Sequence, residues 1–95
     1  MAWEKIVDSD LGIIIIRAED CLHCVELRAV LNEHPLRAPN TWIDKKNAND
    51  LYKRFSLFAA SVDILPFVGI FSNGELKQVV RAATRERIED ALSAS

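Results

Sequence analysis

Residues 13–24, IIIIRAEDCLHC, join four consecutive isoleucines to the only two cysteines of the chain. Isoleucine is stiff at χ1 and favours a strand, and an apolar run without alternation is typical of a strand that is buried on both faces. We therefore predict a central parallel strand at residues 11–16 and a helix that begins at the first cysteine. In that helix Cys21 lies at the exposed N-terminus, whereas Cys24 turns towards the body of the domain.

The segment after the cysteines predicts a helix and then a second strand. From Cys24 to Leu31 the apolar residues recur at helical spacing, which predicts a helix at residues 22–33. Pro35 ends this helix, because the residue before a proline is pushed out of the helical conformation. A β-prone run at residues 41–44 follows, so the order to this point is strand, helix, strand.

The second half of the chain predicts a helix, a β-hairpin and a final helix. Apolar residues again recur at helical spacing over residues 47–61. An Asn-Gly pair at residues 73–74 separates two β-prone runs, at residues 64–71 and 76–81. Asn-Gly is the strongest short-range signal for a hairpin, because both residues accept a positive φ. A helical pattern at residues 84–92 closes the chain.

These elements predict an α/β domain with the order β-α-β-α-β-β-α, built on a central mixed four-stranded sheet with helices on both faces. A chain of 95 residues is long enough for one core and too short for two, so we expect a single domain over residues 1–95. Residues 1–10 fit either a short helix or an irregular strand, because Trp3, Ile6 and Val7 can form the apolar side of each.

The composition argues against nucleic acid and membrane partners. Twelve Lys and Arg residues against fourteen Asp and Glu leave a net charge of −2, without the basic excess that neutralises phosphates. The longest apolar stretch, residues 11–16, is far shorter than the roughly 20 residues that span a bilayer. No secretory signal is visible, so we expect a cytoplasmic protein, although a mature exported form has the same appearance. In a reducing compartment a close cysteine pair is more often catalytic or metal-binding than a permanent crosslink.

Two features that are far apart in the sequence point to the same known fold. A Cys-x-x-Cys lies between the first strand and its helix, and Ile-Leu-Pro at residues 64–66 leads directly into the hairpin. With both features the chain resembles the thioredoxin-like family over about residues 13–92. In that family the proline is cis and lies against the cysteine pair, and the backbone before it pairs with a bound substrate segment. The resemblance implies a cis bond before Pro66 and substrate contacts at Leu65, Pro66 and Leu22.

The cysteine motif departs from that of most thioredoxins. Asp20 stands where a tryptophan usually precedes the first cysteine, and Leu22 and His23 replace Gly-Pro. Ile15 occupies the position of a buried aspartate that many thioredoxins carry. The N-terminal part is shortened towards the layout of glutaredoxins, but their glutathione-binding marks, Thr-Val-Pro and a later Gly-Gly-x-Asp, are missing. We interpret the chain as thioredoxin-like in fold, with a divergent Cys-Leu-His-Cys site.

Disulfide exchange requires an exposed thiolate and a partner thiol within one helical turn. We therefore assign the attack to Cys21 and the resolution of the mixed disulfide to Cys24. The helix N-terminus stabilises a thiolate at Cys21, and a protonated His23 adds a charge-assisted donor. The carboxylates of Asp20 and Glu19 oppose the new negative charge. We expect stabilisation on balance, because the helix end and the histidine act at closer range.

The proton of Cys24 has no obvious acceptor, because Ile15 replaces the buried carboxylate. A water molecule, His23 and the Cys21 thiolate are the three candidates. A histidine between the cysteines stabilises the reduced form, so we predict a reduction potential above that of a typical thioredoxin.

The leading hypothesis is a monomeric thiol–disulfide oxidoreductase that exchanges the Cys21–Cys24 pair with protein disulfides and needs no cofactor. Its reductant is a thioredoxin reductase or a glutathione-linked system. The alternative is a thioredoxin-fold binding module, in which the cysteine pair is vestigial or structural and the surface at Leu65 and Pro66 recruits a partner.

Metal binding is a third hypothesis for the cysteine pair. Structural zinc usually needs four ligands, and beyond the cysteines the chain offers only His23 and the distant His34 as histidine ligands. An iron–sulfur cluster on this pair requires a second copy of the chain. We therefore expect no metal in the monomer.

Overall fold

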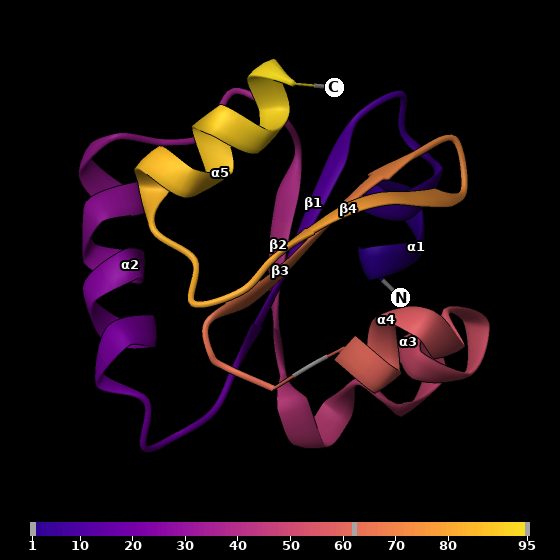
Figure 1. Ribbon diagram of the computed structural model, residues 1–95, viewed down its shortest axis with the longest axis horizontal. Helices are drawn as coiled ribbons and strands as arrows, with labels where there is room; N and C mark the ends of the chain where they lie inside the picture. Colours follow the sequence, from indigo (N-terminus) through magenta and orange to yellow (C-terminus); the bar gives the residue numbers. More distant parts are fainter. Residues whose placement is uncertain (1, 62, 95) are drawn as a thin grey trace.

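A four-stranded mixed sheet lies between two layers of helices in the computed structural model, which describes residues 2–61 and 63–94 (Figure 1). The elements in chain order are α1 (Ala2–Asp8), β1 (Gly12–Arg17), α2 (Leu22–Glu33), β2 (Asn40–Asp44), η1 (Lys45–Asn47), α3 (Asn49–Arg54), α4 (Ser56–Ser61), β3 (Phe67–Ser72), β4 (Glu75–Val80) and α5 (Arg85–Ser93). The α2 and α5 helices cover one face of the sheet, and α1, α3 and α4 cover the other. No helix in this described part of the chain is long and apolar enough to cross a membrane.

The strand β1 occupies the middle of the sheet because its isoleucines are buried on both faces. All four, Ile13 to Ile16, are fully buried. The strand order is β2-β1-β3-β4, with β1 parallel to β2 and antiparallel to β3. Two parallel neighbours need a long crossover connection, and α2 provides it. The structure therefore confirms the predicted mixed four-stranded α/β fold and its central strand.

Alternate isoleucines of β1 belong to two separate hydrophobic cores, as the two-residue period of a strand requires. Ile13 and Ile15 share one core with Leu27 and Leu31 of α2. The other two isoleucines belong to a second core, called the aromatic core below, whose largest members are Trp3, Phe58, Phe67 and Phe71. Leu27 and Leu31 thereby fix α2 on the sheet, which positions the cysteines at its N-terminal end.

The predicted hairpin is confirmed, and it also holds the N-terminal helix. Asn73 and Gly74 have φ values of 51° and 83°, and β3 and β4 pair antiparallel. The backbone N–H of Asn73 donates to the Ser9 carbonyl at 2.7 Å, and that of Gly74 donates to the Val7 carbonyl at 2.9 Å. Of the two structures that the sequence allowed for residues 1–10, the helix is the one observed. Met1 lies outside the described residues, and α1 adds a helix before the predicted order.

The predicted continuous helix at residues 47–61 is wrong, because the chain forms η1, α3 and α4 there in succession. At Phe55 the backbone leaves the helical conformation, with a φ of −127° and a ψ of 76°. Phe55 packs on Phe71 with ring centroids 4.9 Å apart, while Phe58 packs on both Phe67 and Phe71. Aromatic contacts with the sheet therefore override the helical periodicity.

Candidate functional site

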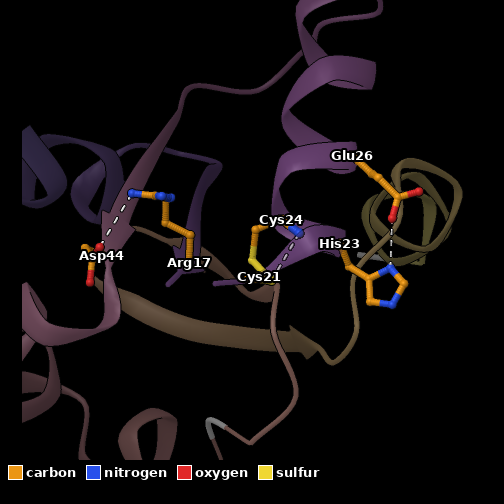
Figure 2. Close-up of a disulfide and its surroundings, with 6 residues drawn as sticks. All are labelled: Arg17, Cys21, His23, Cys24, Glu26 and Asp44. Atoms are coloured by element: carbon orange, nitrogen blue, oxygen red, sulfur yellow. Dashed lines mark hydrogen bonds and ion pairs between the residues drawn. A yellow bond between two sulfur atoms is a disulfide. The ribbon is translucent and has the colours of Figure 1, made fainter. Parts of the chain in front are cut away.

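Cys21 and Cys24 are joined by a disulfide at the start of α2 (Figure 2). Cys21 is the N-cap residue of this helix, and its Sγ accepts a hydrogen bond from the backbone N–H of Cys24 at 3.1 Å. The two Cα atoms are 5.2 Å apart. Cys21 is partly exposed, whereas Cys24 is only 2% exposed. The helix thus carries one cysteine at the surface and one inside, as the sequence predicted.

The hydrogen bond from the Cys24 N–H to Cys21 Sγ should become stronger once the disulfide is reduced and Cys21 is a thiolate. An N–H donor makes a stronger, charge-assisted hydrogen bond with a thiolate than with a neutral sulfur. The unpaired amides and the positive dipole end at a helix N-terminus also favour negative charge at this position. The local geometry therefore favours Cys21 as the thiolate of the reduced protein.

The peptide bond between Leu65 and Pro66 is cis, which confirms the conformation that the resemblance implied. Pro66 is buried and Leu65 is partly exposed. The backbone N–H of Ala83 donates to the Pro66 carbonyl at 2.8 Å, and that of Ala82 donates to the Ile64 carbonyl at 3.3 Å. Backbone hydrogen bonds to the segment after β4 therefore hold this turn in place.

An apolar groove joins the cysteine helix to the turn at Leu65 and Pro66. Its volume is about 470 Å³, and its walls come from α2, from the turn itself and from residues 82–86. His23 lies in the lining together with Leu65 and Pro66. Leu22, the other residue between the cysteines, is 70% exposed. The fold thus brings His23 and the proline turn to one surface, although they are distant in sequence.

His23 points away from the sulfur atoms and towards Glu26 (Figure 2). Its Nδ1 lies 3.1 Å from Glu26 Oε1, and both side chains are largely exposed. The expected donor to a Cys21 thiolate is therefore engaged elsewhere in the disulfide form. Sequence reasoning missed Glu26, although its i,i+3 spacing from His23 on a helix was the available signal. The effect of His23 on the reduction potential stays a prediction.

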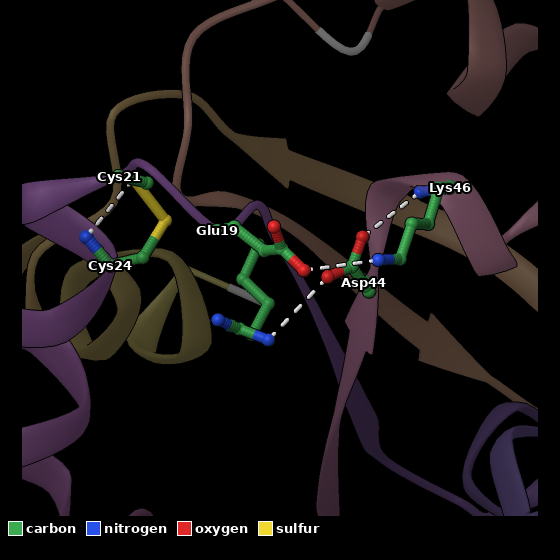
Figure 3. Close-up of polar contacts among 6 residues, drawn as sticks. Glu19, Cys21, Cys24, Asp44 and Lys46 are labelled. Atoms are coloured by element: carbon green, nitrogen blue, oxygen red, sulfur yellow. Dashed lines mark hydrogen bonds and ion pairs between the residues drawn. A yellow bond between two sulfur atoms is a disulfide. The ribbon is translucent and has the colours of Figure 1, made fainter.

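Two ion pairs lie on the other side of the disulfide (Figure 3). Arg17 Nη1 at the end of β1 is 3.5 Å from Asp44 Oδ2 at the end of β2, and Lys46 Nζ is 3.1 Å from Glu19 Oε1. Asp44 also accepts a hydrogen bond from the backbone N–H of Lys46 at 3.1 Å. Glu19 therefore has a cationic partner, which weakens its expected opposition to a nearby thiolate. Asp20 is exposed in the loop before the cysteines.

The described part of the chain offers no ready metal centre. Among residues 2–61 and 63–94, no group of three or more His, Cys, Asp or Glu side chains is placed to hold a metal ion. His34 lies at the C-terminal end of α2, where its carbonyl accepts a hydrogen bond from Arg85 Nε at 2.9 Å. His34 therefore belongs to a helix end and not to the surroundings of the cysteine pair.

Asp63 and Arg81 form an ion pair next to the turn at Leu65 and Pro66. Nε and Nη2 of Arg81 both donate to the Asp63 carboxylate, and this hydrogen bonding lowers the pKa of Asp63. A carboxylate with a lowered folded-state pKa contributes stability above its unfolded pKa, which is about 4. That contribution is lost as the pH falls through the lowered value.

We predict that Asp63→Asn unfolds at a slightly lower urea concentration than the unchanged protein at pH 7. The loss is small because an exposed ion pair is screened by solvent. The difference should fade as the pH falls below about 4, and urea unfolding followed by tryptophan fluorescence measures it at each pH. A difference that persists unchanged in acid would show that Asp63 acts through something other than its charge.

The fold of the chain is similar to that of solved thioredoxins. The thioredoxin of Schistosoma mansoni matches with a TM-score of 0.75 and 16% identity, over 98% of this chain and 83% of that one. A mutant thioredoxin of Halobacterium salinarum matches with a TM-score of 0.73 and 20% identity, over 97% and 80% of the two chains. The thioredoxin of Fasciola hepatica matches with a TM-score of 0.71 and 15% identity, over 97% and 89%.

No protein-family model and no curated protein sequence matches the chain. At such low identity the structural similarity shows the fold, while the chemistry has to be argued from the site. The cysteine pair supplies that link, because it lies at disulfide distance at the start of α2. The chain therefore has a thioredoxin-like fold that carries a Cys-x-x-Cys pair, and this combination supports a thioredoxin-like redox function in general.

Proposed function

We propose that this protein is a small thiol–disulfide oxidoreductase that exchanges the Cys21–Cys24 pair with disulfides of other proteins. The observation that carries the proposal is the position of Cys21 at the N-cap of α2, with the Cys24 N–H directed at its Sγ. In the reduced form this arrangement gives a stabilised thiolate next to a second thiol that can close the ring.

The reduction of a substrate disulfide follows from these positions. The Cys21 thiolate attacks one substrate sulfur, and the electron pair of the broken S–S bond leaves on the other substrate sulfur, which takes up a proton. The Cys24 thiolate then attacks Cys21 Sγ, and the bond between Cys21 and the substrate breaks. Two electrons have then passed to the substrate, and the protein carries the Cys21–Cys24 disulfide.

The substrate is proposed to bind in the groove beside the cysteine pair. We expect Leu65 and Pro66 in the wall of the groove, and the exposed Leu22 at the start of α2, to contact an extended substrate segment. Ile64 and Val30, which are 49% and 41% exposed, extend the apolar surface. Contiguous exposed apolar surface is typical of interaction sites. We therefore expect substrate disulfides that are flanked by apolar residues.

Asp20 and His23 tune the pair in this proposal. Asp20 acts through its charge directly before Cys21, and His23 acts when it leaves Glu26 and donates to the thiolate. A thioredoxin reductase or a glutathione-linked system in the cytoplasm regenerates the dithiol. A monomer is enough for this reaction and needs no cofactor, because the two thiols of Cys21 and Cys24 supply both electrons that pass to the substrate disulfide.

Insulin reduction tests the proposed function. In the presence of dithiothreitol, the protein is expected to accelerate the precipitation of the insulin B chain beyond the rate with dithiothreitol alone. The control is the same amount of protein whose two cysteines have been reduced and alkylated. If the unmodified protein gives no acceleration, the proposal fails, and a binding module that uses the apolar groove becomes the better explanation.

A further inference from the structure

Cys24 borders a second hollow, whose lining includes Arg17 on the side of the disulfide away from His23. This hollow has a volume of about 420 Å³, and Cys24 lies in its wall together with Arg17 and Arg28. Figure 2 shows Arg17 on one side of the disulfide and His23 on the other. Both charged residues in the lining are arginines. The buried cysteine therefore shares this hollow with two positively charged side chains.

The two arginines are held in different ways. The guanidinium of Arg28 lies over the Trp42 ring, 5.4 Å from its centroid. Arg17 stands directly opposite Asp44 in the register of β1 and β2, and the side chains of Arg17 and Asp44 are 34% and 14% exposed. Charge interactions in such partly dry surroundings are stronger than in bulk water. The strand register therefore fixes Arg17 opposite Asp44, where water screens its charge only partly.

Three further ion pairs engage charged groups in the region of the cysteine pair and the turn at Leu65 and Pro66. Ion pairs join Glu19 to Lys46, Glu26 to His23, and Asp63 to Arg81, and Asp20 is exposed in the loop. The contact between Arg17 and Asp44, at 3.5 Å, is longer than any of these three. A guanidinium has five N–H donors, and Asp44 takes one of them. Arg17 therefore keeps donors and charge for a second anion.

We propose that Arg17 stabilises the thiolate of Cys24 while Cys24 resolves the mixed disulfide. This inference rests on the proposed disulfide exchange. It explains how Cys24 can lose its proton although no buried carboxylate is present at position 15. Ile15 is fully buried there and has no group that accepts a proton. A cation next to a thiol favours its thiolate, so Cys24 loses its proton to solvent through the hollow without a buried base. Asp44 holds Arg17 in position and offsets part of its charge.

In the resolving step, the Cys24 thiol first gives its proton to solvent. The thiolate attacks Cys21 Sγ, the bond between the two cysteines forms, and the bond from Cys21 to the substrate sulfur breaks. The electron pair leaves on the substrate sulfur, which takes up a proton. Arg17 is a positioning residue here, because it changes the fraction of Cys24 present as thiolate and forms no bond to sulfur.

Stopped-flow reaction of the reduced protein with dithiodipyridine isolates this step. Attack by Cys21 releases a first thiopyridone, and attack by Cys24 on the resulting mixed disulfide releases a second. The reagent is neutral, so the loss of an arginine does not change its attraction to the protein. The rate of the second release is measured across pH for the unchanged protein and for Arg17→Met, Arg17→Lys and Asp44→Asn.

Arg17→Met is expected to raise the pH at which the second release reaches half its maximal rate by about one unit, which slows the release roughly tenfold at neutral pH. Arg17→Lys should restore most of the rate. Asp44→Asn should move the midpoint to lower pH, because the amide still accepts a hydrogen bond from Arg17 but no longer offsets its charge. Arg54→Met is the matched control, since Arg54 also pairs with a carboxylate, that of Asp8, but lies over Trp3 of the aromatic core. Its midpoint should not move.

An unchanged midpoint in Arg17→Met would overturn the proposal. The same upward shift in Arg17→Met and Asp44→Asn would also overturn it, because the ion pair would then act only as a structural link. If the unchanged protein releases no second thiopyridone, the proposed exchange itself fails, and this inference fails with it. If the unchanged protein releases the second thiopyridone and Arg17→Met does not shift the midpoint, the role of Arg17 is refuted and the proposed exchange stands.

Discussion

The Cys24→Ser protein is expected to attack a disulfide once and then stop, whereas Cys21→Ser is expected not to attack at all. Cys21 holds the partly exposed N-cap position, and Cys24, which is 2% exposed, cannot meet a protein substrate in its place. A serine hydroxyl at position 24 does not displace the substrate sulfur, because the nucleophile in this exchange is a thiolate. Insulin reduction by Cys21→Ser should therefore fall to the rate of dithiothreitol alone. Cys24→Ser should be much slower than the unchanged protein, because only dithiothreitol can then release the trapped substrate.

The two variants differ in what they trap. When mixed with insulin without dithiothreitol, Cys24→Ser should accumulate a mixed disulfide between Cys21 and insulin, in which one insulin disulfide has been broken. Intact mass spectrometry detects this adduct, and dithiothreitol removes it. Cys24→Ala is the matched control and should trap the same adduct, since neither side chain can resolve it. Cys21→Ser should trap none. Adducts on Cys21→Ser in place of Cys24→Ser would reverse the assigned roles.

The parts of the fold that the sequence predicted correctly depend on short-range signals. Four adjacent isoleucines must be buried wherever the strand lies, so they identify the central strand before any partner is known. Asn73 and Gly74 adopt the positive φ values that a tight hairpin needs. The position of Cys21 follows in the same way, because a helix that begins directly after it makes it the N-cap.

The predictions that failed or stayed open depend on contacts between distant residues. The helix α1 has seven residues, too few to be stable alone, and it exists because Trp3 and Val7 are buried and the hairpin binds its end. The break at Phe55 likewise has no local signal, since it reflects the fit of Phe55 and Phe58 against the sheet. Helical periodicity alone could not indicate either feature.

The sequence indicated the position of the cysteine pair and the cis bond before Pro66, but not the ion pairs near the cysteines. Arg17 and Asp44 are 27 residues apart in the sequence and meet only because the register of β1 against β2 sets them opposite each other. By contrast, the contact of His23 with Glu26 follows from helical spacing. The ion pair of Arg17 with Asp44 therefore depends on strand pairing, which a single sequence does not reveal.

Phe58→Ala is expected to lower the free energy of unfolding by about 3–5 kcal/mol. The side chain is fully buried, and its ring centroid lies 5.3 Å from that of Phe67 and 5.7 Å from that of Phe71. A Cβ added at Gly69 would meet the Phe58 ring at 2.6 Å, so the sheet is packed directly against this ring. Native domains have only about 5–15 kcal/mol of stability in total. Chemical denaturation measures the loss as a lower midpoint at constant slope.

Leu57→Ala is the matched control, because Leu57 precedes Phe58 on α4 yet is 79% exposed. Its stability should change by less than about 0.5 kcal/mol. Equal losses in the two variants would contradict the packing argument, because α4 would then contribute through its backbone alone. Since α4 and α2 lie on opposite faces of the sheet (Figure 1), folded Phe58→Ala should keep the thiopyridone release rates of the unchanged protein. A loss of stability with intact exchange would show that the aromatic core supports the fold without tuning the cysteines.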